Sequence, residues 1–98
     1  MRQYPIEGRL PIMIFREGKS FVSYAPNLDL SSCGDTQEEA KRNLGDAIAI
    51  LIEECLKDGT LEDVLRSCGW REKRKPSRQW LPPEFEFSQI PIATHGKK

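Results

Sequence analysis

Residues 10–56 read LPIMIFREGKSFVSYAPNLDLSSCGDTQEEAKRNLGDAIAILIEECL, and this stretch decides the fold. Apolar residues fill two short segments, about Arg9–Arg16 and Ser20–Tyr24, which are separated by the turn residues Glu17-Gly18-Lys19. Gly18 can take the positive φ that a tight hairpin turn needs, so the two segments are expected to be antiparallel strands. A third short strand is expected at about Leu30–Cys33, and a helical pattern follows it directly. This order predicts a compact β-β-β-α unit.

The helix after the third strand has the clearest local signals in the chain. Thr36 is a good N-cap residue, and Glu39 three positions later completes the capping-box pattern. Apolar residues then recur at helical spacing and form one stripe: Ala40, Leu44, Ala47, Ile48, Leu51, Ile52 and Cys55. Ile50 lies off this stripe, and Gly59 is the expected αL residue that ends the helix. The pattern predicts one long amphipathic helix that packs on the sheet.

The first strand is apolar on both of its faces, because successive side chains of a strand point to opposite sides. One face carries Leu10, Ile12 and Ile14, and the other carries Pro11, Met13 and Phe15. A single helix covers one face of the sheet only, so the second face predicts a partner protein or a second copy. We expect a homodimer or higher homo-oligomer. The candidate contact residues for a partner or a second copy are Met13, Phe15, Tyr24, Ile50, Phe85 and Phe87.

The C-terminal third is predicted to contain less regular structure. Residues 1–70 form the first unit, which ends with a short second helix, and residues 71–83 read as a basic linker that contains prolines. Residues 84–92 alternate between polar and apolar types and predict a last strand, and residues 93–98 are expected to be a tail. The whole chain is thus predicted to be one α+β domain with the order β-β-β-α-α-β. Its antiparallel sheet has three or four strands, and one long helix packs on it.

The charge of the chain is balanced but unevenly distributed. With 15 basic and 15 acidic residues the formal net charge is zero, which gives no argument for nucleic-acid binding. Five basic residues nevertheless crowd into residues 71–78: Arg71, Lys73, Arg74, Lys75 and Arg78. A solvated linker is the simplest interpretation. The alternatives are contact with RNA, helped by Trp70 and Trp80 at the ends of the run, or an arm that wraps an acidic partner.

The cysteine pattern and the hydropathy bear on the cellular compartment. Cys33, Cys55 and Cys68 form no C-x-x-C pair and match no zinc-site spacing, so a reduced, cytoplasmic protein is the simplest interpretation. The first residues lead into no long apolar run, and we expect no signal peptide. The longest apolar run is far shorter than the roughly 20 residues that span a membrane. No membrane association is expected.

The sequence contains no recognisable catalytic constellation. The candidate carboxylates for a metal site are Glu17, Asp29, Asp35 and Glu39, but Glu17 lies in a turn and Glu39 belongs to the helix cap. His95 is the single histidine and lies in the predicted tail, where nothing holds a general base in place. We therefore expect a protein that is not an enzyme and that needs no metal or cofactor.

Three segments occur in a fixed order after the two-faced strand. They are the turn Glu17-Gly18-Lys19, the segment Phe21–Leu28 (FVSYAPNL) and the helix entry Gly34–Ala40 (GDTQEEA). In this order the chain resembles the HicB-like antitoxin family of type II toxin–antitoxin (HicAB) modules. The family pattern reads aromatic or aliphatic-Val-Ala-Tyr-x-Pro-x-Leu and then G-D-T-x-E-E-A. The resemblance covers residues 10–57 and fades over residues 71–98.

The resemblance implies a partial RNase H-like fold and a role in neutralising a HicA-like toxin. HicA is a small protein, similar to a double-stranded-RNA-binding domain, that cleaves mRNA, and the implied mechanism is steric occlusion without any catalytic residue. Many family members also carry a C-terminal helix-turn-helix or ribbon-helix-helix domain that binds operator DNA. Residues 71–98 are too short for such a domain and show no helical pattern, so we do not expect DNA binding.

Two other functions stay open. The chain can be an orphan HicB-like module without a toxin, which binds RNA or another protein through residues 71–78. It can also be a degenerate RNase H-like enzyme that depends on Asp29 or Asp35.

Overall fold

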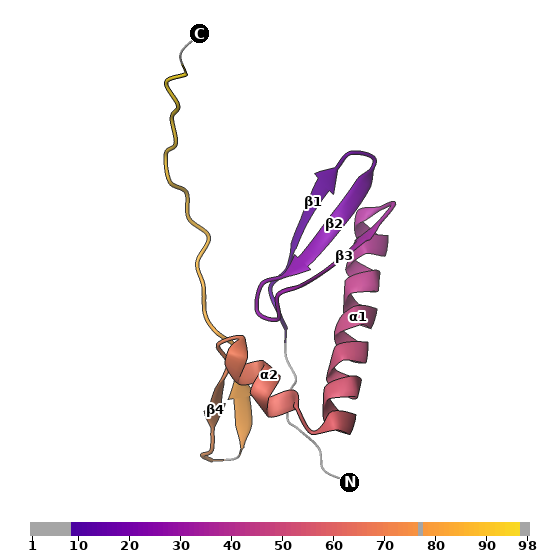
Figure 1. The fold of residues 1–98 in the computed structure, drawn as a ribbon, viewed down its shortest axis with the longest axis vertical. Helices are drawn as coiled ribbons and strands as arrows, with labels where there is room; N and C mark the ends of the chain where they lie inside the picture. Colours follow the sequence, from indigo (N-terminus) through magenta and orange to yellow (C-terminus); the bar gives the residue numbers. More distant parts are fainter. Residues whose placement is uncertain (1–8, 77, 97–98) are drawn as a thin grey trace.

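The computed structural model describes residues 9–76 and 78–96 of the chain. The predicted start of the first unit at residue 1 and the last two residues of the predicted tail lie outside this part. The elements, in chain order, are β1 Met13–Glu17, β2 Ser20–Ala25, β3 Leu30–Gly34, α1 Gln37–Asp58, α2 Leu61–Ser67, β4 Arg71–Lys73 and β5 Gln79–Leu81 (Figure 1). The α+β class, the three-stranded antiparallel sheet and the single long helix are confirmed. A second, two-stranded sheet was not predicted.

The first sheet is a meander with the strand order β1-β2-β3, and both pairs are antiparallel. Gly18 takes φ 64° in the turn between β1 and β2, as the sequence predicts. The register places Ile14 opposite Ser23 and Ser23 opposite Ser32, so these side chains share one face. β1 is shorter than predicted at its start, because residues 9–12 precede the first ladder pair.

Both ends of α1 are fixed by the signals that the sequence carries. The Thr36 hydroxyl accepts a hydrogen bond from the Glu39 backbone N–H at 3.0 Å. The Glu39 carboxylate reaches back to the N–H of Asp35 at 2.8 Å, one residue earlier than in the usual capping box. At the other end, Gly59 adopts the left-handed conformation with φ 70°, and its N–H bonds to the last turn of the helix.

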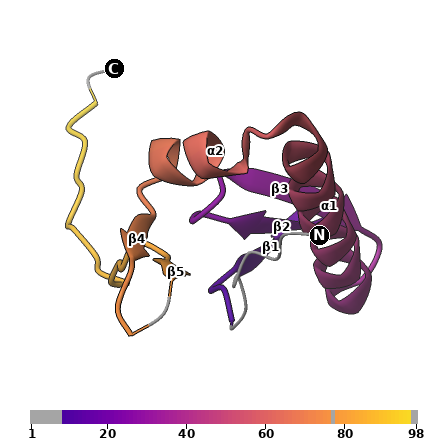
Figure 2. The ribbon, with the colours of Figure 1, turned by 90° about the horizontal axis from the view of Figure 1, so that it is seen from below.

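The start of α1 packs closely on the sheet through small residues. Gly34 ends β3 so near the helix that a Cβ there would lie 2.6 Å from the Ala40 nitrogen, a distance that only glycine avoids. Ser23, which is fully buried, donates its hydroxyl to the Ala40 carbonyl at 2.7 Å. This bond satisfies a polar group that would otherwise be buried at a cost. Figure 2 shows that α1 covers one side of the sheet, whereas β4 and β5 lie toward the other side.

The prediction of a linker over residues 71–83 is wrong where β4, Arg71–Lys73, pairs antiparallel with β5, Gln79–Leu81; these two strands are here called the hairpin. The hairpin forms because both tryptophans around the basic run enter the core. Trp70 and Trp80 are 6% and 3% exposed and pack with Leu61 and Leu65 of α2. The Trp70 indole N–H also donates to the Asn27 carbonyl at 2.8 Å, which ties the hairpin to the turn between β2 and β3.

The prediction of a strand over residues 84–92 is also wrong, because no ladder partner exists for it in the described part of the chain. Residues 84–96, here called the C-terminal arm, begin beside the hairpin and run as an extended chain on the side of the sheet away from α1, separate from the sheet in both views (Figures 1 and 2). The arm gives the molecule a radius of gyration of 17.1 Å. A compact domain of this length would have about 13 Å.

Candidate functional site

The face of the sheet opposite α1 carries a row of exposed apolar side chains. The ladder pairs Met13 with Tyr24, Phe15 with Val22, and Val22 with Cys33, so these residues share this face. Met13 and Phe15 are 39% and 46% exposed. We call this surface the open face. The two-sided apolar pattern of the first strand therefore leads to the outcome that the sequence predicts: one side under a helix and one side exposed.

A hydrogen bond fixes the polar end of the open face. The Tyr24 hydroxyl donates to the Asp29 carboxylate at 2.8 Å, and Asp29 itself adopts a positive φ of 51° in the turn before β3. This hydrogen bond, followed by desolvation and the negative charge of Asp29, raises the pKa of Tyr24 above its ordinary value of 10. The Asp29 carboxylate thus has a structural role, because it holds the Tyr24 ring in place.

The other predicted contact residues do not join the open face. Ile50 is 60% exposed but lies on α1, which packs on the opposite face of the sheet. Phe85 and Phe87 lie in the C-terminal arm, where their rings meet edge to face with centroids 5.4 Å apart. The six candidates are therefore distributed over three separate surfaces of the described chain.

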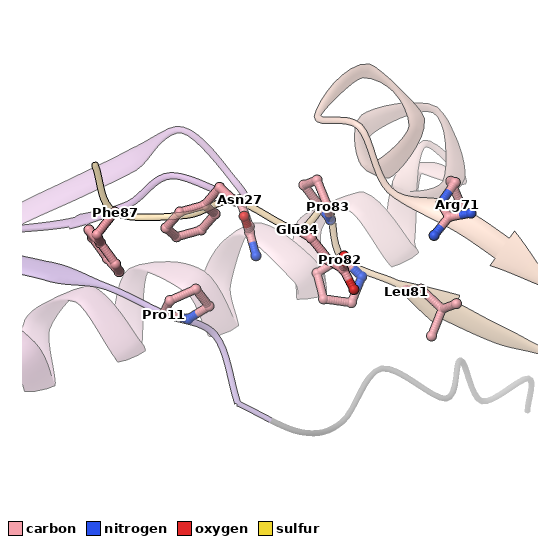
Figure 3. Close-up of a pocket in the computed structure, with 9 residues that line it drawn as sticks. Pro11, Asn27, Arg71, Leu81, Pro82, Pro83, Glu84 and Phe87 are labelled. Atoms are coloured by element: carbon pink, nitrogen blue, oxygen red, sulfur yellow. The ribbon is translucent and has the colours of Figure 1, made fainter. Parts of the chain in front are cut away.

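A shallow cavity of about 490 Å³ lies where the arm leaves the body (Figure 3). Its lining is mostly apolar and comes from the segment before β1, the end of β5 and the first arm residues: Pro11, Asn27, Arg71, Leu81, Pro82, Pro83, Glu84, Phe85 and Phe87. Asn27 is buried, and its carbonyl is engaged by Trp70. The cavity shows that the first arm residues stay beside the body, whereas the arm beyond Phe87 does not line it.

The basic run does not form a continuous cationic surface, because the hairpin folds part of it around an acid. Arg66 and Arg74 approach the Glu72 carboxylate at 3.6 Å and 3.5 Å. Arg78 donates to Glu72 through Nε and to Glu62 through Nη2, the latter at 2.6 Å. Two of the five predicted nucleic-acid contacts are therefore held in ion pairs within the chain.

The arginines also change the titration of this cluster. Desolvation by itself raises the pKa of the Glu72 carboxyl, but the hydrogen bonds and charges of Arg78 and Arg74 outweigh it. The pKa of Glu72 consequently lies below its ordinary value of 4.5. The pKa of Arg78 is raised, mainly by its hydrogen bond to Glu62 and then by that to Glu72. Both groups stay charged over the whole physiological range.

The remaining cations of the run have another orientation. Arg71 and Lys73 flank Glu72 in β4, so their side chains leave the strand on the side opposite to Glu72. Both are exposed, as is Lys75 in the hairpin loop. No ion pair joins these three to another residue within ranges 9–76 and 78–96. Within the described residues, these three of the five cations are thus presented to solvent without an ion pair.

The acidic and nucleophilic residues are not gathered into a chemical centre. Among the residues that the structure describes, no group of three or more His, Cys, Asp and Glu side chains is placed to hold a metal ion. Asp29 is bonded to Tyr24, and Glu39 is bonded to the helix entry. The cysteines are free: Cys33 is exposed on the open face, Cys55 is buried and Cys68 is half-buried.

Sequence reasoning missed three contacts that organise these surfaces. The first is the ion-pair cluster around Glu72, and the second is the burial of Trp80 beneath the Arg66 guanidinium, 5.1 Å from the ring centroid. The third is the hydrogen bond from Asn43 of α1 to the Cys33 carbonyl at 2.8 Å. A signal for the hairpin was present, because Trp70, Glu72 and Trp80 have the right parity to face one side of two paired strands.

No family model matches this chain, and no curated protein or solved structure matches it either.

Within the described residues, no helix combines the length and the apolar character that crossing a membrane requires.

Proposed function

We propose that this chain is a HicB-like antitoxin that binds a HicA-type, mRNA-cleaving toxin and blocks it by occlusion. The observation that carries the proposal is the open face, a sheet surface with exposed Met13 and Phe15 behind a helix-covered core. The β-β-β-α arrangement of residues 13–58 agrees with the partial RNase H-like fold that the family resemblance implies.

The chemistry of the open face suits a protein partner. Methionine and aromatic residues are enriched at protein interfaces, because they bury much apolar area and adapt their shape to a partner. Tyr24 adds a hydroxyl at the border of this surface, and its bond to Asp29 keeps the ring in one orientation. A preorganised aromatic side chain loses little conformational freedom on binding. The toxin would dock here and lose access to RNA.

The proposed action is binding without catalysis. Asp29 and Glu39, two of the carboxylates considered for a nuclease site, are engaged in a turn and in a helix cap. These contacts give the two acids a structural role. Metal-dependent RNA cleavage by the purified chain, lost in Asp29→Asn, would instead support the degenerate RNase H-like enzyme.

A second candidate function, binding of RNA or of an acidic protein, rests on Arg71, Lys73 and Lys75. These cations are exposed and carry no ion pair within the described residues. Phosphate contacts of this kind weaken steeply as salt is raised. Loss of RNA binding in Arg71→Gln/Lys73→Gln, with toxin inhibition unchanged, would separate this function from the first one.

The decisive experiment is a cleavage assay with the toxin-sized product of the neighbouring gene. The protein should copurify with that product and suppress its cleavage of RNA in proportion to the amount added. Phe15→Glu should weaken inhibition by about tenfold or more, because it places a charge in the apolar contact. Ile50→Glu changes an exposed apolar residue away from the open face and should inhibit normally. Failure of the wild-type chain to bind or inhibit any such product would refute the proposal.

A further inference from the structure

We propose that the C-terminal arm is exchanged between two copies of this chain and adds as a fourth strand to the open edge of β1 in the partner copy. The open edge is the side of β1 that does not face β2. The inference does not depend on the proposed antitoxin function, because both of its tests use this protein alone.

The two edges of the sheet differ in their cover. β3 is closely packed against α1, and its Cys33 carbonyl accepts the side-chain N–H of Asn43 at 2.8 Å. β1 forms the other edge and pairs with β2 only. Every second N–H and C=O of an edge strand points away from the ladder. The backbone groups of β1 therefore offer a free template for one more strand.

The arm has the properties of that missing strand. It is extended over residues 84–96, and no backbone hydrogen bond joins it to the rest of the described chain. Phe87, Ile90 and Ile92 are 72%, 80% and 86% exposed, more than any other large apolar residues that the structure describes. At about 3.3 Å per residue, these 13 residues can extend for roughly 40 Å, more than twice the length of β1.

The charges of the two segments are complementary. Residues 9–17, which lead into and form β1, contain Arg9, Arg16 and a single acid, Glu17, so two positive charges face one negative charge. The arm from 84 to 96 contains Glu84 and Glu86 and no lysine or arginine. Pro91 cannot donate a hydrogen bond, but an added strand is itself an edge and tolerates a proline on its outer side.

The occupant of the open edge is a second copy, because the arm does not fill the open edge of its own copy. Pro82 and Pro83 have fixed φ values and favour an extended chain, and from there the arm runs beside its own β1–β3 sheet, separate from it and on the side away from α1 (Figures 1 and 2). Within the described residues it makes no backbone hydrogen bond to that sheet. Every copy presents both an arm and an open edge. Reciprocal exchange about a two-fold axis satisfies both arms and both edges at once, and it closes the assembly as a dimer.

The test measures molar mass by sedimentation equilibrium on the full chain and compares two double variants. Phe87→Asp/Ile90→Asp changes the arm, and Ile50→Asp/Leu56→Asp makes the same change at exposed positions of α1. The wild type and the α1 variant should have the mass of a dimer, whereas the arm variant should have the mass of a monomer. All three should show the same helical signal in circular dichroism and the same cooperative unfolding, since none of these side chains belongs to the buried core.

Amide hydrogen exchange then identifies the contact. In the dimer, the amides of β1 that face the open edge should exchange at least about tenfold more slowly than in the arm variant. A wild type that is monomeric at about 100 μM would overturn the proposal, because such a dimer would be too weak to matter. It would also fail if β1 stayed protected in the monomer, since the arm would then close on its own sheet. Dissociation by the α1 variant alone would place the interface on the helix.

Discussion

Two neighbouring regions of the C-terminal third adopt the opposite of the secondary structure that their sequences suggest. Residues 71–81 have a mostly polar and basic sequence, yet β4 and β5 within this range form a hairpin that buries Trp80 and closes the core under α2. Residues 84–92 alternate like a strand, yet they remain unpaired and exposed. The difference shows that an alternating pattern specifies only which side chains would lie on each face of a sheet if a strand formed. Whether the strand forms depends on a ladder partner, which local sequence does not supply.

The two strands of the hairpin pair with each other, because β4 and β5 are close in the chain and both carry groups that face α2. Trp80 buries apolar area. Glu72, its ladder partner, forms ion pairs with Arg66, Arg74 and Arg78, whose positive charges would otherwise repel one another. The arm has no such internal complement. Its side chains Phe87, Ile90 and Ile92 stay exposed.

The largest expected effect on the free energy of unfolding compares the contributions of the hairpin and the arm to the core. Trp80→Ala should lower the free energy of unfolding by about 3–5 kcal/mol, because it leaves a large cavity between the hairpin and α2. Phe87→Ala in the arm should change it by less than about 0.5 kcal/mol when both are measured on the monomer. Urea denaturation followed by circular dichroism compares the two variants. Equal losses would mean that the arm packs on the body as the hairpin does.

A smaller effect distinguishes the two tryptophans of the hairpin region. Trp70→Phe removes the indole that donates to the Asn27 carbonyl and should cost about 1–3 kcal/mol, because it leaves a buried carbonyl without its donor. Trp80→Phe should cost less, since the Trp80 indole N–H has no hydrogen-bond partner in the described chain. The same denaturation assay measures both losses. A larger cost for Trp80→Phe would show that packing area, and not the hydrogen bond, attaches the hairpin.

The next prediction compares the threonine that caps α1 with a threonine in the arm. Thr36→Ala should destabilise the protein by about 1 kcal/mol, because the Glu39 N–H loses its cap. Thr94→Ala, in the exposed arm, should leave the midpoint of thermal unfolding unchanged. An unchanged midpoint in the Thr36 variant would mean that sheet packing alone fixes the start of α1.

The smallest effect concerns pH and the acid at the centre of the hairpin. Because the folded-state pKa of Glu72 is lowered, its stabilising contribution is fully present above 4.5 and is lost as the pH falls through the folded-state value. Urea midpoints measured from neutral pH down to about pH 3 should therefore fall less steeply in Glu72→Gln than in the wild type. Glu54→Gln, at an exposed position of α1, serves as the control and should keep the wild-type slope. Identical slopes in all three proteins would show that the ion-pair cluster adds nothing to stability.

Most of the N-terminal unit follows from its sequence, because its signals are local. The Gly18 turn, the Thr36 cap, the Gly59 terminus and the helical apolar stripe each act within a few residues, and the structure contains all of them. The exposure of Met13 and Phe15 was also predictable, since a strand that is apolar on both faces exceeds what one helix can cover. The position of Asn43 against β3 was not predictable, because it depends on how α1 crosses the sheet.

Local sequence patterns set the elements whose hydrogen bonds close within a few residues: the first hairpin, the long helix and its two ends. Packing between distant segments instead holds Arg74 and Arg78 in ion pairs beside Trp80, places the predicted contact residues on three surfaces and leaves the arm unpaired. The physical reason is that a helix bonds to its own backbone four residues away. A strand and an ion pair instead need partners whose positions are set by the packing of distant segments.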